Sequence, residues 1–129
     1  MTKKDVQLKK YSISSARYRE LKYFCLQYDE WKAILSSETS ALKAVRISDM
    51  PSSHGISDET ALIALKRAEV SEKCDMIEGS AIEADPEIYP YIIKNVTQGI
   101  LYEYMDIPCG RRQFYQARRK FFYILSKKR

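Results

Sequence analysis

Hydrophobic residues recur at steps of three and four along the first part of the chain, which is the spacing of one face of an α-helix. The pattern predicts a helix of about six turns that begins near Ser14 or Ser15, either of which can cap it. The residues on this face are Tyr18, Leu21, Phe24, Cys25, Tyr28, Trp31 and Leu35. From Leu21 onward the spacing also approximates a heptad, so the face can pack inside one domain or against a second copy in a homodimer.

A second long helix is predicted from Ser57, its cap, to about Ala84. Its predicted buried face comprises Ile63, Val70, Cys74, Ile77 and Ala81, widened at the start by Leu62 and Leu65. The run Asp85-Pro86-Glu87 then predicts a new helix start, with a cap, a proline at the first position and an acid in the first turn. The next apolar face comprises Ile88, Tyr91, Ile92 and Val96. Residues 97–99, which end in a glycine, predict the stop of this helix.

The scarcity of turn-forming residues indicates an all-α protein, because the whole chain contains only four glycines and four prolines. Four segments are expected along this chain. They are a basic tail and long amphipathic helix at 1–45, a linker at 46–57, central acidic helices at 58–96 and a helix-turn-helix at 97–129.

The last segment has the pattern of a helix-turn-helix, with a short helix at about 100–105, a tight turn at 106–110 and a longer helix at about 110–126. Ile107 is expected to fill the space between the two helices, and Pro108 prevents the first helix from continuing. The apolar stripe of the longer helix comprises Phe114, Ala117, Phe121, Ile124 and Leu125.

The charge of this segment is suited to a polyanion. Residues 107–129 contain eight Lys or Arg and no Asp or Glu, whereas residues 48–106 contain four basic and twelve acidic residues. Arginine can pair with guanine and glutamine with adenine in the major groove, mostly from the first turns of a recognition helix. The candidate base-reading residues are Arg111, Arg112, Gln113 and Gln116. The candidate phosphate contacts are Arg118, Arg119, Lys120, Lys127, Lys128 and Arg129.

Other classes of function find little support. The chain has one histidine, His54, in the predicted linker, and no catalytic motif, so we expect no enzyme. Three cysteines without a paired motif predict reduced thiols, with no metal site and no cofactor. There is no apolar run that could span a membrane and no secretory signal pattern, so a cytoplasmic location is expected.

Three stretches resemble the RinA/ArpU group of phage-encoded transcriptional regulators. They are YDEWK (residues 28–32), GISDETA (55–61), and above all IPCGRRQFY (107–115) with RRKFF (118–122). The resemblance implies a sequence-specific activator of phage late genes, working in the bacterial host cytoplasm. It also implies a C-terminal helix similar to that of sigma-factor region 4, with base reading by Arg111, Arg112, Gln113 and Gln116. RNA polymerase is then a second expected partner besides double-stranded DNA.

Two alternatives remain open. A small terminase subunit is also small, helical and DNA-binding, but usually places its DNA-binding unit before its oligomerising helices, the reverse of the order here. A protein-interaction module would use the Leu21–Leu35 seam and bind no DNA. Aromatic residues beside the basic helix, such as Phe122 and Tyr123, could also stack on single-stranded bases, although most are expected to be core residues.

Overall fold

The computed structural model describes residues 11–36 and 58–129, and all regular secondary structure in these two ranges is helical. The expected all-α class is therefore confirmed for this part of the chain. Residues 1–10 of the predicted basic tail and the whole predicted linker at 46–57 lie outside the described residues, and so does Ser57, the predicted cap of the second long helix. The chain divides into a larger unit, residues 1–27 and 75–129, and a smaller unit, residues 28–74.

The first helix, α2 (Ser15–Leu26), begins where the sequence predicts. Ser14 has extended backbone angles, and its hydroxyl accepts a hydrogen bond from the amide of Arg17 at 3.1 Å. The prediction of one continuous six-turn helix is wrong. Helix α2 ends at Leu26, and helical structure resumes at residues 28–36. The side-chain amide of Gln27 donates to the carbonyl of Tyr23 at 3.3 Å, and the backbone amide of Gln27 bonds Phe24 instead. The side chain of Gln27 thus takes the carbonyl that its own backbone amide would bond in a regular α-helix, and the series of helical hydrogen bonds is interrupted there.

The longest of the described helices, α4 (Asp58–Ala84), has residues in both units, and its C-terminal end matches the prediction. The residues predicted for its inner face are buried from Val70 onward: Val70, Cys74, Ile77 and Ala81. The predicted widening of this face is wrong, because Leu62 and Leu65 are 65% and 58% exposed. In the smaller unit, Trp31 is buried and the ammonium of Lys73 lies 5.3 Å from its ring centroid.

Helix α5 (Tyr89–Gln98) starts later than the sequence predicts. Asp85 accepts hydrogen bonds from the amides of Glu87 and Ile88, so it caps a turn that precedes the helix. Pro90, rather than Pro86, occupies the first turn of α5. The helix stops as predicted at Gly99, whose φ of 71° lies in the left-handed region and whose amide bonds Asn95.

The segment after Gly99 departs from the predicted short α-helix at 100–105. It contains only the single 3-10 turn η1 (Tyr102–Tyr104), with extended residues on both sides. The last helix, α6 (Arg111–Lys128), follows as predicted. The helices next to the turn are therefore α5 and α6, joined by residues 99–110, rather than a short helix and α6 joined by 106–110.

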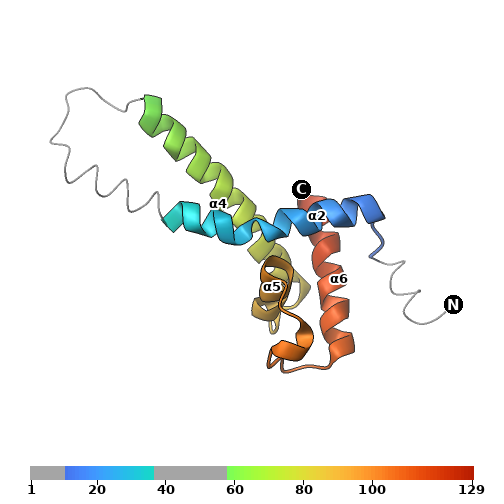
Figure 1. The fold of residues 1–129 in the computed structure, drawn as a ribbon. Coiled ribbons are helices and arrows are strands. Elements are labelled where there is room, and N and C mark those ends of the chain that lie inside the picture. Colours follow the sequence, from blue (N-terminus) through green and yellow to red (C-terminus); the bar gives the residue numbers. More distant parts are fainter. Residues whose placement is uncertain (1–10, 37–57) are drawn as a thin grey trace. The chain divides into compact units, whose positions relative to one another are not determined.

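In the larger unit, α2 packs against α5 and α6, and α5 also packs against α6 (Figure 1). The largest fully buried side chains of this unit belong to Leu21, Ile77, Ile88, Ile92, Phe114, Phe121 and Leu125. The guanidinium of Arg17 donates to the carbonyl of Ser126 at 3.1 Å, so α2 satisfies one of the last carbonyls of α6. This packing fixes which face of α6 remains accessible.

Candidate nucleic-acid interface

Helix α6 has an unusual charge arrangement at its N-terminal end. Its N-cap, Gly110, makes no side-chain cap, and no acidic residue occupies the first turn. Arg111 and Arg112 instead stand at the end of the helix where the backbone dipole is positive. An anion is favoured at this end of α6 for three reasons. They are the two cationic side chains, the uncapped backbone amides and the positive end of the helix dipole.

The inner face of α6 is wider than the sequence predicts. Phe114, Phe121 and Leu125 are fully buried and Ala117 is nearly so, as expected, whereas Ile124 is half-buried. Phe122, outside the predicted stripe, is 2% exposed, and its ring makes an edge contact with Tyr18 of α2 at 5.0 Å between centroids. Helix α6 therefore presents apolar side chains to two neighbours, α2 and α5. The single apolar stripe predicted from the sequence does not account for both of these contacts.

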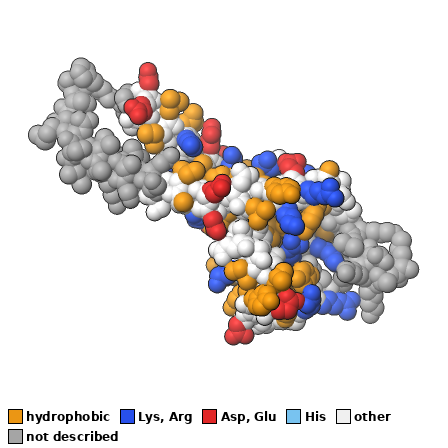
Figure 2. Space-filling view, in the orientation of Figure 1, with side chains coloured by type: hydrophobic (Ala, Val, Ile, Leu, Met, Phe, Trp, Pro, Cys, Tyr) orange, Lys and Arg blue, Asp and Glu red, His pale blue; other side chains and the backbone are white. Residues whose placement is uncertain are grey.

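The outer face carries the predicted base-reading residues. Arg111, Arg112 and Gln113 are exposed at the start of α6, and Gln116, Arg119 and Lys120 are half-buried one to two turns later. Among the described residues, no carboxylate lies within ion-pair distance of Arg112, Arg119 or Lys120. Figure 2 shows Lys and Arg side chains gathered over the region of α6. The positive charge of this face is therefore left largely uncompensated.

Arg111 differs from Arg112 because it has partners. Its guanidinium forms an ion pair with Glu103 of η1 and lies 5.5 Å from the ring centroid of Tyr115. Both members of the ion pair are largely exposed, so the pair contributes little stability. It does orient Arg111 toward the loop that precedes α6, and reading of a base by Arg111 requires exchange of this carboxylate.

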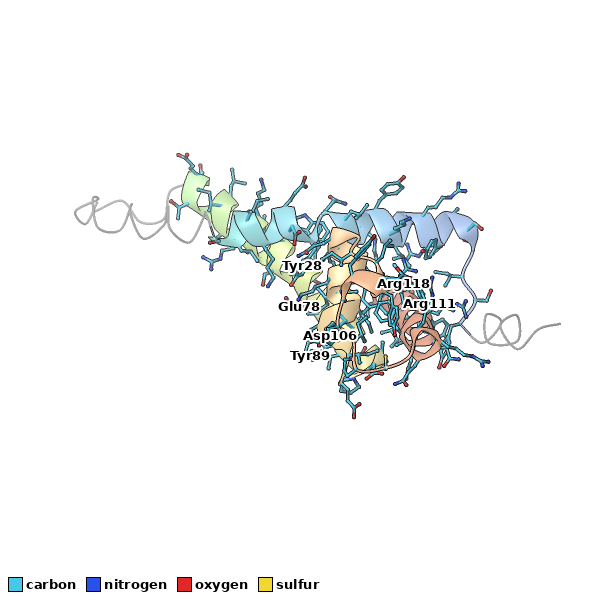
Figure 3. The ribbon with its side chains drawn as sticks, turned by 60° about the horizontal axis from the view of Figure 1, so that its bottom comes forward. Tyr28, Glu78, Tyr89, Asp106, Arg111 and Arg118 are labelled. Carbon is cyan, nitrogen blue, oxygen red and sulfur yellow. The ribbon has the colours of Figure 1, made fainter. Side chains whose placement is uncertain are left out.

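Arg118, a predicted phosphate contact, is held inside the larger unit. Its Nε donates to the side-chain oxygen of Asn95 on α5 at 2.7 Å. Its guanidinium lies 5.0 Å from the ring centroid of Phe122 and 5.8 Å from that of Tyr18. Arg118 thus joins α2, α5 and α6, and only its terminal nitrogens remain for an outside ligand. Figure 3 labels Arg118 and Arg111 among the side chains of α6.

The basic residues at the C-terminal end of α6 also have partners. Lys128 pairs with Glu83 at 2.9 Å, and Arg129 pairs with Glu20 at 3.2 Å while lying 4.2 Å from the ring centroid of Phe24. The ammonium of Lys127 lies 4.4 Å from the ring centroid of Tyr123. These contacts weaken the case for Lys128 and Arg129 as phosphate contacts and leave the N-terminal half of α6 as the stronger candidate.

Glu20 anchors this C-terminal cluster. A hydrogen bond from Arg17, with further contributions from the charges of Arg17 and Arg129, lowers the pKa of Glu20, while desolvation opposes the shift. The carboxylate thus stays ionised and holds both arginines at the place where α2 crosses the end of α6 (Figure 1).

The loop before α6 is fixed by side-chain hydrogen bonds. The hydroxyl of Tyr102 donates to the carbonyl of Cys109 at 2.7 Å, and the amide of Asn95 donates to the carbonyl of Ile100 at 2.9 Å. Tyr102 also contacts Phe114 at 5.6 Å between ring centroids. These bonds set the start of α6, a positioning role that the sequence pattern did not assign to Tyr102 or Asn95.

The residues that the structure describes form neither a metal cluster nor a membrane-spanning helix. No group of three His, Cys, Asp or Glu side chains in residues 11–36 and 58–129 could hold a metal ion, and His54 lies outside these ranges. No helix within the described segments has the length and apolar character needed to cross a bilayer. Cys25 and Cys74 are buried, and Cys109 is half-buried.

Comparison with known proteins identifies no relative. No family model, no curated protein and no solved structure matches this chain. The physical features of α6 and its surroundings therefore carry the functional argument.

Proposed function

We propose that this protein is a sequence-specific, double-stranded DNA-binding transcriptional regulator that places α6 in the major groove. One observation carries the proposal. Helix α6 buries its aromatic side on α2 and α5 and presents Arg112, Gln113 and Lys120 on a face without a neutralising carboxylate among the described residues. A helix of this kind suits a groove lined by phosphates and base edges.

The length and support of α6 are compatible with this role. It contains 18 residues, and the Arg17–Ser126 hydrogen bond together with the Asn95–Arg118 hydrogen bond hold it against two other helices. A recognition helix must be rigid for its side chains to meet base edges at a fixed register. In the proposed complex α5 takes the part of the supporting helix, although the connection through residues 99–110 is longer than the usual helix-turn-helix turn.

The roles of individual residues follow from their positions. Arg112 and Gln113 are exposed in the first turn and are proposed to read bases, with Gln116 one turn further. Arg119 and Lys120 are proposed to contact phosphates. The resemblance to RinA/ArpU regulators adds the proposal that the target is a phage late promoter and that RNA polymerase is a second partner.

The proposal is tested by competition binding at two salt concentrations. Purified full-length protein is mixed with DNA fragments from its own genetic neighbourhood and an excess of random DNA, and retained fragments are footprinted. Arg112→Ala is compared with Lys22→Ala, which removes the same charge from an exposed position on α2. A defined footprint that Arg112→Ala abolishes and Lys22→Ala preserves supports the proposal.

The other outcomes separate the alternatives. Salt-sensitive binding without sequence preference, together with a large ring in solution, indicates a packaging protein. Absence of binding at both salt concentrations indicates that α6 contacts protein rather than DNA, and the proposal is then wrong.

A further inference from the structure

A pocket of about 320 Å³ lies between the start of α2 and the middle of α6, within the larger unit. Its volume is at the lower end of the range, about 300–1,000 Å³, that is typical of small-molecule sites. The pocket is separate from the exposed first turn of α6, where base reading is proposed. The residues that line it are Tyr11, Ser12, Ile13, Ser15, Tyr18, Arg118, Arg119 and Phe122.

One side of this pocket is aromatic. The rings of Tyr18 and Phe122 meet edge to face, and the ring of Tyr11 lies 5.3 Å from that of Tyr123 between centroids. The guanidinium of Arg118 lies over both Tyr18 and Phe122. Aromatic rings beside a guanidinium plane form the surface on which unstacked nucleic-acid bases are commonly bound.

The pocket is also positively charged. Arg118 and Arg119 are half-buried, yet among the described residues no carboxylate lies within ion-pair distance of either guanidinium. Partly buried arginines are usually matched by an anion, because desolvation of an unmatched charge is costly. Ser15, the first residue of α2, borders the pocket, so the positive end of that helix adds to the same potential.

The lining therefore suits a ligand that carries an anionic group and an aromatic group side by side. Inorganic phosphate alone would leave the Tyr18 and Phe122 side of the pocket unfilled, and a neutral aromatic compound would leave both arginines unmatched. We infer that this pocket binds a single nucleotide unit, with the base against the partly exposed ring of Tyr18 and the phosphate between Arg118 and Arg119. The unit is either a free nucleoside monophosphate or one nucleotide of a single strand.

Arg118 and Arg119 are expected to have different roles in binding the nucleotide. Arg118 is fixed by its bond to Asn95, so it presents a preoriented guanidinium next to the rings. Arg119 has no ion pair to exchange within residues 11–36 and 58–129, so its guanidinium can close on the phosphate. The site does not depend on recognition of double-stranded DNA by the first turn of α6, and either property can exist without the other.

The test uses the full chain, isothermal titration and nuclear magnetic resonance of the aromatic ring protons. The probes are nucleoside 5′-monophosphates, the matching nucleosides, inorganic phosphate and a short single-stranded oligonucleotide. Arg119→Gln is the test variant, since no carboxylate among the described residues pairs with Arg119. Lys22→Gln is the control, since it removes an exposed charge of α2 that lies outside the pocket. Loss of a charge-assisted hydrogen bond predicts a drop in affinity of about ten- to a hundredfold for Arg119→Gln and no change for Lys22→Gln.

The inference is supported if a monophosphate or the oligonucleotide binds with this dependence on Arg119 and shifts the Tyr18 and Phe122 ring signals. Binding of the monophosphate identifies a free ligand, and binding of the oligonucleotide alone identifies a strand. The inference is wrong if inorganic phosphate binds as tightly as the monophosphate, or if no probe binds in an Arg119-dependent way. Double-stranded DNA binding of Arg112→Ala is measured in parallel, so failure of the pocket and failure of the proposed function are distinguished.

Discussion

The side chain of Arg118 on α6 donates from Nε to the side-chain oxygen of Asn95 on α5, at 2.7 Å. The same Asn95 side chain donates to the carbonyl of Ile100 at 2.9 Å, so one residue ties α6 and the loop before it to α5. The guanidinium of Arg118 also covers the rings of Tyr18 and Phe122. A residue that charge alone assigns to phosphate binding is therefore part of the packing that orients α6.

Arg118→Ala is expected to destabilise the protein by about 1.5–3 kcal/mol, the usual loss for a hydrogen bond to a charged group. Arg118→Lys keeps the charge but loses the planar contact with the rings and the Nε bond, so it is expected to recover little. Urea denaturation measures both. A double-mutant cycle with Asn95→Ala should give a coupling of at least about 0.5 kcal/mol, and strictly additive losses would contradict the proposed connection.

Two glycines of the connection between α5 and α6 should respond oppositely to the same substitution. Gly99→Ser places a side chain at a φ of 71° and should cost about 1 kcal/mol or more. Gly110→Ser leaves an extended N-cap with open space around it and should gain a few tenths of a kcal/mol by capping α6. Thermal or urea denaturation of both variants checks the pair, and a loss for Gly110→Ser equal to that for Gly99→Ser would be contrary to the described backbone.

The buried thiol of Cys25 predicts a pH dependence in the alkaline range. Desolvation raises the pKa of Cys25 from its ordinary value of 9.0 to about 12, while the charge of Arg118 opposes the shift. The folded state disfavours the thiolate. The contribution of Cys25 to the free energy of unfolding is therefore fully present below pH 9 and is lost as the pH rises toward 12. The free energy of unfolding should then fall by up to about 1.4 kcal/mol per pH unit from this group. Cys25→Ala should flatten the curve above pH 9, and an unchanged slope would argue against a buried thiol.

Cysteine accessibility gives a second, independent measure of the packing. Cys25 and Cys74 are at most 1% exposed, whereas Cys109 is half-buried in the loop before α6. A thiol reagent should label only Cys109 in the folded protein, and slowly, because desolvation and the charge of Asp85 raise the pKa of Cys109. Labelling of all three thiols at one rate would show that the larger unit opens readily.

The local signals in the sequence were sufficient for several boundaries. The hydroxyl of Ser14 caps α2, and Gly99 ends α5 in the left-handed conformation, because each depends on the chemistry of one residue and its immediate neighbours. The end of α4 at Ala84 and the extent of α6 follow from a different signal. A periodic apolar face stops at the end of α4 and begins again in α6.

Features that depend on packing between helices were not predictable in this way. The break at Gln27 follows from a competition for the carbonyl of Tyr23, and the burial of Phe122 follows from the presence of α2 beside α6. The segment at 100–105 has apolar residues at helical spacing, yet bonds made by Tyr102 and Asn95 hold it as an irregular loop with one 3-10 turn. The division of the basic residues into paired and unpaired ones also required the positions of Glu20, Glu83 and Glu103.

If α6 reads DNA, substitution of Arg112 and substitution of Lys120 should affect DNA binding in different ways. Arg112→Ala is expected to cost about 1–3 kcal/mol at the specific site, as for a lost arginine–guanine pair, and little on random DNA. Lys120→Ala is expected to weaken binding to any sequence and to reduce the slope of log affinity against log salt by about one. Equal losses for both variants on specific and random DNA would contradict the separation of base-reading from phosphate-binding residues.

DNA recognition by α6 is tested most directly by footprinting of the wild-type protein, Arg112→Ala and Lys22→Ala on DNA from the protein's own genetic neighbourhood, with random DNA as competitor. A discrete footprint upstream of a block of genes, lost in Arg112→Ala and kept in Lys22→Ala, is the result expected for a recognition helix at α6. No protection by the wild-type protein at low or high salt, with all three proteins folded, would mean that α6 does not recognise DNA.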